Sequence, residues 1–386
     1  MTGPVSAAIG KESSSRTAFQ ASSRHNNFDF LRFLLAVIVI HTHSYALCGA
    51  EYTGFLQRLR HLDFGGAWLA VNGFFAISGF LIAGSWMKSP SLGEYLRRRA
   101  LRIYPGFIAC TVLCVVLVGP LGGADLGSYF GDWRTYAFFQ PLILGPTASL
   151  PGVFTSVPWH GVVNASLWTI RFELFCYLLL ATLGLSGALR RPRVILALFA
   201  VALACQFAEQ HEWPTRWNMV FPFAGDLWEL PRLIVFFLAG ATLFVYRNRI
   251  PLDGRLATAC VLALSVAFYV RATTLLLPVC GVYLLFYFAF SPRVGLQHFG
   301  KHGDFSYGMY LYAFPIQQLL VHHFSGVRSP ILLTLLALPL TFGAAFMSWH
   351  LVEKPFLALK KKRHPSTGSA GDETPMAAAA VSAPTT

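Results

Sequence analysis

Residues 28–47 read FDFLRFLLAVIVIHTHSYAL. A helix of about 20 largely apolar residues is long enough to cross the hydrocarbon core of a bilayer, so this stretch predicts a membrane span. Four ionisable side chains interrupt it, namely Asp29, Arg32, His41 and His43. An ionisable group inside a span is costly, and each of these residues is therefore a candidate for function.

Similar apolar segments recur along the whole chain. Of its 386 residues 55% are hydrophobic and 12% are charged, against roughly 25% charged in an average soluble domain. That composition excludes an ordinary soluble enzyme and a disordered chain. We predict an all-α polytopic membrane protein with about ten transmembrane helices, near 28–48, 67–87, 101–119, 164–184, 193–209, 229–246, 256–271, 273–290, 304–323 and 330–351.

The basic residues predict the orientation of these helices. The net charge of +13 would suggest nucleic acid on a soluble protein, but here the basic residues lie in short segments between apolar runs. That pattern is typical of cytoplasmic loops, so we expect no nucleic-acid partner. The short run 133–145 ends at Pro146 and is interpreted as re-entrant or interfacial. With that run not spanning, the basic segments share one side and both termini are predicted to be cytoplasmic.

The chain is expected to contain one folded domain. We predict a cytoplasmic N-terminal tail over 1–27, a membrane domain over 28–356, and a C-terminal tail over 357–386 that is first basic and then disordered. No internal repeat is visible, which weakens a transporter built from inverted halves. The seven cysteines form no CxxC motif or cluster with metal-ligand spacing, so no metal site is expected.

Two ionisable residues of the first span share a helix face. Arg32 and His43 are 11 residues apart, which is about three turns plus 20° of rotation and about 16 Å of rise. His41 points about 180° away from Arg32. An inward-facing stripe would place Arg32 near the cytoplasmic end and His43 deeper. The alternative is that Arg32 snorkels to the interface and His43 is a packing residue.

The third span is preceded by RRRALRIYP, residues 97–105. Arg99 and Arg102 lie three residues apart, so they share a face at the start of a helix, where the helix dipole also favours an anion. This arrangement suits a phosphate-bearing ligand such as a nucleotide-containing donor. The alternative is that these arginines only contact lipid phosphates, and we prefer it for Arg97 and Arg98.

Further ionisable and small residues interrupt other spans. Arg171 and Glu173 are two residues apart and point to different faces, so Glu173 needs another partner or is protonated. Gly73 and Gly79 flank Ser78 and are interpreted mainly as helix-packing positions. At the end of the last span, a further group is interpreted as an interfacial anchor: His350, Glu353 and Lys354.

Taken in order, these motifs resemble the acyltransferase-3 family, bacterial integral membrane proteins that O-acylate surface carbohydrates and some lipids or small molecules. The resemblance covers residues 28–356. It is carried by FDFLRF with the later histidine, FFAISGFL, the RxxR of Arg99 and Arg102 with IYP, SLWTIRFELFCY, SYGMYLY followed by proline, and HLVEKPF. Many members carry a histidine in the YLxHxP segment, where this chain has Ala313.

The resemblance implies a multi-pass protein of the bacterial inner membrane, surrounded by lipid, with no bound cofactor. Its donor would be an acyl-CoA, usually acetyl-CoA, and its acceptor a hydroxyl of a carbohydrate or polyprenyl-linked glycan, as in exopolysaccharide or lipopolysaccharide. The family's Arg-x10-His pair maps onto Arg32 and His43, and its RxxR pair onto Arg99 and Arg102. Its acidic residue maps onto Glu173.

The mechanistic hypothesis assigns a role to each candidate. Donor-binding residues are Arg99 and Arg102, and His43 is a general base or accepts the acyl group itself. Glu173 or Asp29 would orient His43, and Arg32 would polarise the thioester or bind donor phosphate. The remaining candidates for substrate binding are Asp29, Trp168 and Arg171.

Two other functions compete with acyl transfer. A transporter or flippase for a lipid-linked glycan intermediate would use intramembrane arginine, histidine and glutamate as a permeation path. It would release no thiol from acetyl-CoA. A non-enzymatic sensor has no positive support in the sequence.

Overall fold

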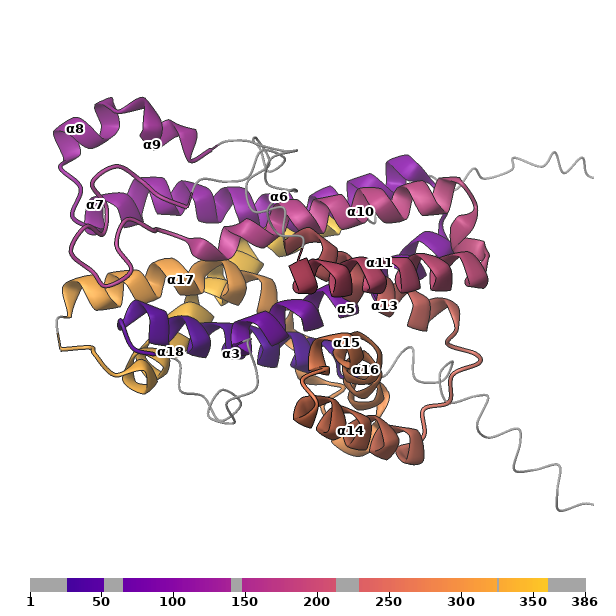
Figure 1. The fold of residues 1–386 in the computed structure, drawn as a ribbon. Helices are drawn as coiled ribbons and strands as arrows, with labels where there is room; N and C mark the ends of the chain where they lie inside the picture. The colour runs from indigo at the N-terminus through magenta and orange to yellow at the C-terminus, as the bar shows by residue number, and fades with distance from the viewer. Residues whose placement is uncertain (1–25, 52–64, 140–147, 213–228, 325, 360–386) are drawn as a thin grey trace, which may run out of the picture.

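The computed structural model describes residues 26–51, 65–139, 148–212, 229–324 and 326–359. These residues form a bundle of helices and contain no strand (Figure 1). The long helices are α3 (Phe28–Leu47), α5 (Gly66–Lys88), α6 (Leu92–Leu113), α10 (Ile170–Leu185), α11 (Pro192–Glu212), α13 (Leu230–Val245), α14 (Gly254–Tyr269), α16 (Val282–Phe290), α17 (Ser306–His323) and α18 (Pro330–Ser348).

Short helical turns extend or connect these helices. Three π-helical turns continue longer helices, namely η1 (Cys114–Val118), η6 (Leu277–Gly281) and η9 (Trp349–Glu353). The other short elements that matter below are α7 (Gly119–Leu121), α8 (Leu126–Gly131), α9 (Trp133–Ala137), η3 (Ala165–Thr169), α15 (Thr273–Leu276), η8 (Phe299–His302) and α19 (Lys354–Ala358).

Each of the ten predicted spans coincides with helix, which confirms the all-α polytopic class. Six helical segments of the described chain are long and apolar enough to cross a membrane, and three shorter apolar helices accompany them. The number of spans and the side on which the termini lie stay predictions. Residues 1–25 and 360–386, which hold most of both predicted tails, lie outside the described residues.

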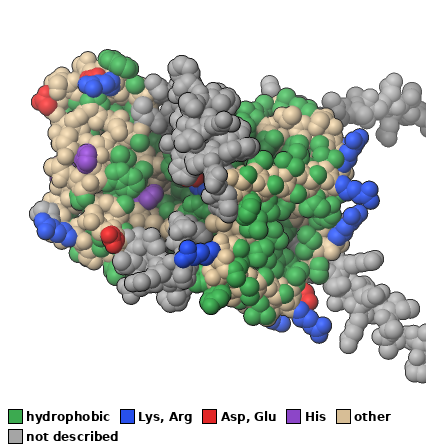
Figure 2. Space-filling view, viewed as in Figure 1, with side chains coloured by type: hydrophobic (Ala, Val, Ile, Leu, Met, Phe, Trp, Pro, Cys, Tyr) green, Lys and Arg blue, Asp and Glu red, His purple; other side chains and the backbone are tan. Residues whose placement is uncertain are grey.

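The surface of the bundle matches a lipid environment. Hydrophobic side chains cover much of the face shown in Figure 2, and several Lys and Arg side chains project together at its right-hand end. Large apolar side chains point outward on several helices, such as Val266 on α14 and Leu335 on α18, both 62% exposed. In water such a surface would aggregate, whereas in a bilayer it faces lipid.

The predicted re-entrant run is only partly described. Its described part is α9, a five-residue helix that Asp132 caps by accepting a hydrogen bond from the backbone N–H of Arg134 at 2.8 Å. The side chains of Trp133 and Tyr136 are exposed. This helix is too short to cross a membrane. Residues 140–145 of the run lie outside the described residues.

Helices α5 and α13 form the most extensive helix pair, and two glycines explain how close they come. A Cβ atom on Gly79 would lie 1.9 Å from the carbonyl oxygen of Phe237, and one on Gly240 would lie 1.9 Å from that of Ala76. At each glycine, the backbone of the facing helix therefore occupies the space that a side chain would need. The packing interpretation of Gly79 is confirmed, and the contact is of the small-residue type that brings membrane helices together.

Candidate active site

A cavity of about 930 Å³, its open mouth included, lies among α3, α5, α6, α10 and α17. We call it the arginine cavity because three arginine side chains line it, namely Arg32, Arg99 and Arg102. Glu173 is the one carboxylate among its lining residues, and carboxylates just outside the lining pair with Arg32 and Arg102.

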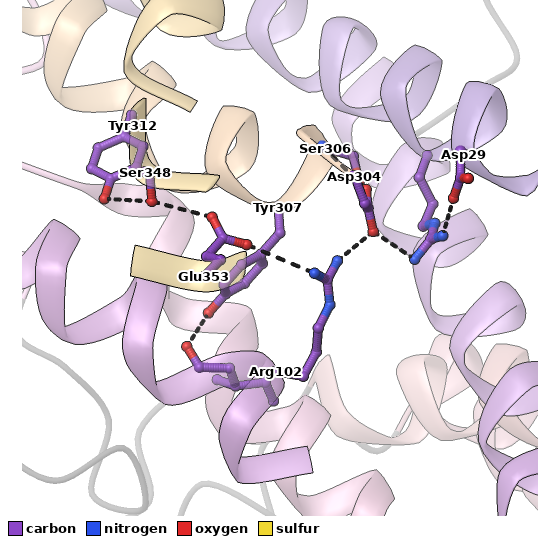
Figure 3. A network of polar contacts seen from close by, with 10 residues as sticks. Asp29, Arg102, Asp304, Ser306, Tyr307, Tyr312, Ser348 and Glu353 are labelled. Carbon is purple, nitrogen blue, oxygen red and sulfur yellow. Dashed lines mark hydrogen bonds and ion pairs between the residues drawn. The ribbon is translucent and has the colours of Figure 1, made fainter. Parts of the chain in front are cut away.

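Arg102 is held by two carboxylates from distant parts of the sequence. It forms an ion pair with Asp304, and its Nη1 lies 3.7 Å from Oε2 of Glu353 (Figure 3). Its guanidinium also lies 5.6 Å from the centre of the Tyr307 ring, and the Tyr307 hydroxyl donates to the carbonyl of Ile103 at 2.9 Å. These contacts fix the middle of α6 against α17 and η9. Because α6 begins at Leu92, Arg99 and Arg102 lie inside the helix, and the prediction that they occupy a helix start favoured by the dipole is wrong.

Asp304 joins the two predicted arginine motifs. It pairs with Arg102 and, at 3.0 Å, with Arg32, and it accepts a 2.5 Å hydrogen bond from the Ser306 hydroxyl (Figure 3). Burial alone would raise the pKa of this carboxyl in the loop before α17. The two guanidiniums and Ser306 outweigh burial and hold its pKa well below the ordinary value.

Arg99 contacts aromatic rings instead of carboxylates. Its guanidinium lies 6.0 Å from the centre of the Tyr95 ring and 5.8 Å from that of Tyr177, which are cation–π contacts. Within the described residues its Nε has no hydrogen-bond partner, and no ion pair with it is found. Of the three arginines in the cavity, Arg99 is therefore the one for which no carboxylate partner is found among the described residues.

Glu353 is not the interfacial anchor that the sequence suggested. Its carboxylate is 2% exposed, and the Ser348 hydroxyl donates to it at 3.1 Å while the Tyr312 hydroxyl donates to Ser348 at 3.2 Å (Figure 3). The interpretation failed because the π-helical turn η9 and the facing helices α6 and α17 enclose this end of α18. Lys354 is exposed, as an anchor would be.

Replacing Asp304 with asparagine is expected to destabilise the folded protein by about 3 kcal/mol, because it leaves two partly buried guanidiniums without their shared carboxylate. A carboxyl with a depressed pKa contributes stability above its ordinary pKa and loses it only in strong acid. The cost should therefore be equal at pH 5 and pH 7. Thermal unfolding in lipid nanodiscs measures it, and Asp253→Asn at the exposed start of α14 is the matched control. Equal melting of both variants would contradict this role.

His43 lies in a second cavity, of about 470 Å³ with its open mouth included, which we call the histidine cavity. It is lined by side chains from α3, α5, η3, α13 and α17: Val39, His43, Ala67, Trp68, Val71, Trp168, Glu229, Arg232 and Tyr310. Val71 and Tyr310 also line the arginine cavity, so the two cavities are neighbours. The His43 ring lies 5.2 Å from that of Phe314, and its Nδ1 has no hydrogen-bond partner among the described residues.

The lining of the histidine cavity also contains a buried ion pair. The Nε of Arg232 donates to Glu229 at 2.7 Å, and its Nη1 donates to Oδ1 of Asn72 at 2.5 Å. The guanidinium also lies 4.9 Å from the centre of the Trp68 ring. Helix α13 thus brings a charged pair to the cavity that contains His43.

The whole bundle matches known proteins. A sequence profile described as an acyltransferase domain matches residues 25–350. The chain belongs to the acyltransferase-3 family. It is 28% identical to an O-acetyl transferase of Shigella phage Sf6 over 343 residues, which cover 86% of this chain and 96% of the relative. It is 25% identical to nodulation protein 10 of Rhizobium leguminosarum bv. viciae over 372 residues, which cover 88% and 95%. No solved structure matches.

As a member of the acyltransferase-3 family, the chain places its motif residues in two groups. Arg32, Arg99 and Arg102 line the arginine cavity, while His43 lines the histidine cavity further along α3. The position of the family's YLxHxP histidine is held by Ala313, which is fully buried among apolar side chains between α17, α3 and α18. That position contributes packing in this chain.

The acidic residues predicted to orient His43 are placed elsewhere. Glu173 lines the arginine cavity and accepts a hydrogen bond from the Tyr177 hydroxyl. Asp29 pairs with Arg32 at 2.5 Å, at the opposite end of α3 and about 21 Å of helix rise from His43. No contact between His43 and either carboxylate is found among the described residues, so this geometry corrects their predicted role as its partners.

The other two substrate-binding candidates also separate. Trp168 lines the histidine cavity beside His43. Arg171 lines neither described cavity, and its guanidinium lies 4.7 Å from the centre of the Phe172 ring. Because the two residues are three apart across the junction of η3 and α10, only Trp168 is placed to meet a ligand near His43.

Sequence reasoning missed several residues of the site. Arg232 breaks the apolar run ELPRLIVFF and Asp304 precedes α17, so both could have been noticed as ionisable groups near spans. The pairing of Asp304 with two arginines from α3 and α6 could not, because it joins segments about 200 residues or more apart.

Proposed function

We propose that this membrane acyltransferase moves an acetyl group from acetyl-CoA to a hydroxyl of a cell-surface carbohydrate, in the cytoplasmic membrane of a bacterium. The observation that carries the proposal is the adjacency of the two cavities. A cavity lined by three arginines shares Val71 and Tyr310 with the cavity that contains His43. The printed name of the phage relative, O-acetyl transferase, supports the choice of an acetyl ester.

The arginine cavity suits the donor. The phosphates of CoA are anionic, and guanidinium groups bind phosphate oxygens through charge-assisted hydrogen bonds. Arg99 is the first candidate, because its charge faces aromatic rings instead of a carboxylate. Arg102 and Arg32 keep Asp304 between them, and their remaining N–H groups are available as donors at the cavity. The basic end of the bundle then faces the cytoplasm, where acetyl-CoA is made.

The chemical step takes place beside His43. The acceptor hydroxyl oxygen attacks the thioester carbonyl carbon, and the bond between that carbon and the CoA sulfur breaks. His43 takes the proton of the hydroxyl and returns it to the sulfur, so the products are an ester and the CoA thiol. The free Nδ1 of His43 is consistent with a base that meets its partner only when substrate is bound.

The proposal predicts a donor-binding defect for Arg99. In membranes containing the protein and its acceptor, release of CoA thiol from acetyl-CoA should follow saturation kinetics. Arg99→Gln should raise the KM for acetyl-CoA about tenfold or more, because a hydrogen bond to a charged group is lost. The matched control is Arg97→Gln, since Arg97 is partly exposed, lines neither cavity and donates to the carbonyl of Leu359.

Two outcomes would count against the proposal. Absence of thiol release from wild-type membranes would favour the transporter alternative. An equal rise in KM for both arginine variants would show that the effect is general loss of surface charge and not donor binding.

A further inference from the structure

The two cavities differ in charge. In the arginine cavity, Arg32 and Arg102 are paired with carboxylates, but no ion pair with Arg99 is found among the described residues. In the histidine cavity, one guanidinium and one carboxylate, Arg232 and Glu229, are bonded to each other, so their formal charges cancel. A cavity without excess charge does not favour a phosphate. Its paired groups still offer N–H donors and carboxylate lone pairs to neutral hydroxyls.

The Arg232 side chain is fixed before any ligand arrives. It is 9% exposed and is held by Glu229, by Asn72 on α5 and by the Trp68 ring. A buried ion pair in an apolar helix carries a desolvation penalty. The close contact of α5 with α13 is already provided by Gly79 and Gly240. The pair is therefore better explained by ligand recognition than by packing.

One residue that lines the histidine cavity has an unpartnered polar atom. The Nδ1 of His43 is buried and has no hydrogen-bond partner among the described residues. Asn72 lies behind the lining, where it is fully buried and bonds Arg232 through its amide oxygen. Buried donors and acceptors are normally satisfied, so the Nδ1 of His43 indicates a polar ligand.

Aromatic side chains complete the cavity. Trp168 and Tyr310 line it, and the Tyr310 hydroxyl shares a 2.8 Å hydrogen bond with Thr169. A flat aromatic ring packs well against the C–H face of a sugar ring, while a few placed polar groups fix its orientation. This combination matches a neutral, hydroxyl-rich ligand.

We propose that the histidine cavity is the acceptor subsite and that it binds a neutral sugar ring. Glu229 and Arg232 bind hydroxyls of the ring, Trp168 packs on its face, and the hydroxyl to be acylated lies at His43. This inference rests on the proposed function, because it names where the acceptor binds. The donor enters from the arginine cavity, so the two substrates occupy different cavities that meet at Val71 and Tyr310.

Protection of His43 from chemical modification tests the subsite without requiring acyl transfer. The full-length protein in lipid nanodiscs is treated with diethyl pyrocarbonate, and the modified His43 peptide is quantified by mass spectrometry. The probes are octyl β-D-glucopyranoside and octyl phosphate, both below the concentration at which they form micelles. The neutral glycoside should slow the modification of His43, and the anion should not. The exposed His302 reports any general effect of either probe.

Variants identify the residues that bind the glycoside. Arg232→Lys and Glu229→Gln should each weaken protection about tenfold, the loss expected for one hydrogen bond to a charged group. Trp168→Leu leaves the buried ion pair intact and tests the same subsite if the other variants do not accumulate. Arg247→Lys, beyond the opposite end of α13 and outside both cavities, should keep full protection.

Three results would overturn the subsite. They are absence of protection by the glycoside, equal protection by octyl phosphate, and unchanged protection in all three cavity variants. A protein whose His43 is protected but whose membranes release no thiol from acetyl-CoA gives a different answer. It would contradict the proposed function and leave the sugar site in place.

Discussion

Replacing His43 with alanine is expected to remove nearly all acyl transfer. A positioned general base contributes typically 10²–10⁴-fold to a rate, and no other histidine lines either described cavity. The measurement is the ester-linked acetyl content of surface carbohydrates. It compares a strain lacking the gene with strains restored by wild type or by His43→Ala at matched protein level.

His41 provides the control on the same helix. Its Nδ1 lies 3.2 Å from the Thr334 hydroxyl on α18, on the face of α3 away from the cavity. His41→Ala should restore most of the esters. Full restoration by His43→Ala would show that the catalytic assignment is wrong. Loss in both variants would point to a structural role for this part of α3.

Replacing Gly79 with valine is expected to prevent accumulation of the folded protein. The new Cβ would lie 1.9 Å from a backbone carbonyl of α13, and a rigid backbone cannot move aside as a flexible side chain can. We expect a loss of at least about 3 kcal/mol, the upper end of the range for overpacking. Yield after membrane extraction and the thermal midpoint in nanodiscs measure the effect.

Gly343 on α18 is the matched control, since no atom lies within 4 Å of the Cβ that it would gain. Gly343→Val should accumulate and melt like wild type. If Gly79→Val behaved like Gly343→Val, the close approach of α5 and α13 would not exist in the membrane.

The sequence predicts the helices of this fold well because membrane helices depend on local composition. About 20 apolar residues suffice to identify a span, and all ten predicted segments are helical. Helix geometry also places Arg99 beside Arg102 without any knowledge of neighbours. Contacts between helices are a different matter, since no local pattern states which face of α13 meets α5.

In the candidate site, too, the local sequence predicts individual residues but not the contacts between helices. Arg32, Arg99, Arg102 and Glu173 could be selected because each is an ionisable group in or next to a span, and all four line one cavity. The sequence could not show which carboxylate pairs with which arginine or histidine. Glu353 was misjudged because its burial depends on α6 and α17, and Glu229 and Arg232 line the cavity of His43 only because α13 packs there.

The π-helical turn η9 makes the spacing of residues at the end of α18 as important as their identity. A π-helical turn holds one residue more than an α-helical turn, so the side chains after it are rotated by about 100° relative to an uninterrupted helix. Glu353 is the last residue of this turn. A deletion of one residue between Trp349 and Glu353 could therefore keep the helix continuous and every charged group present, yet turn this carboxylate away from Arg102.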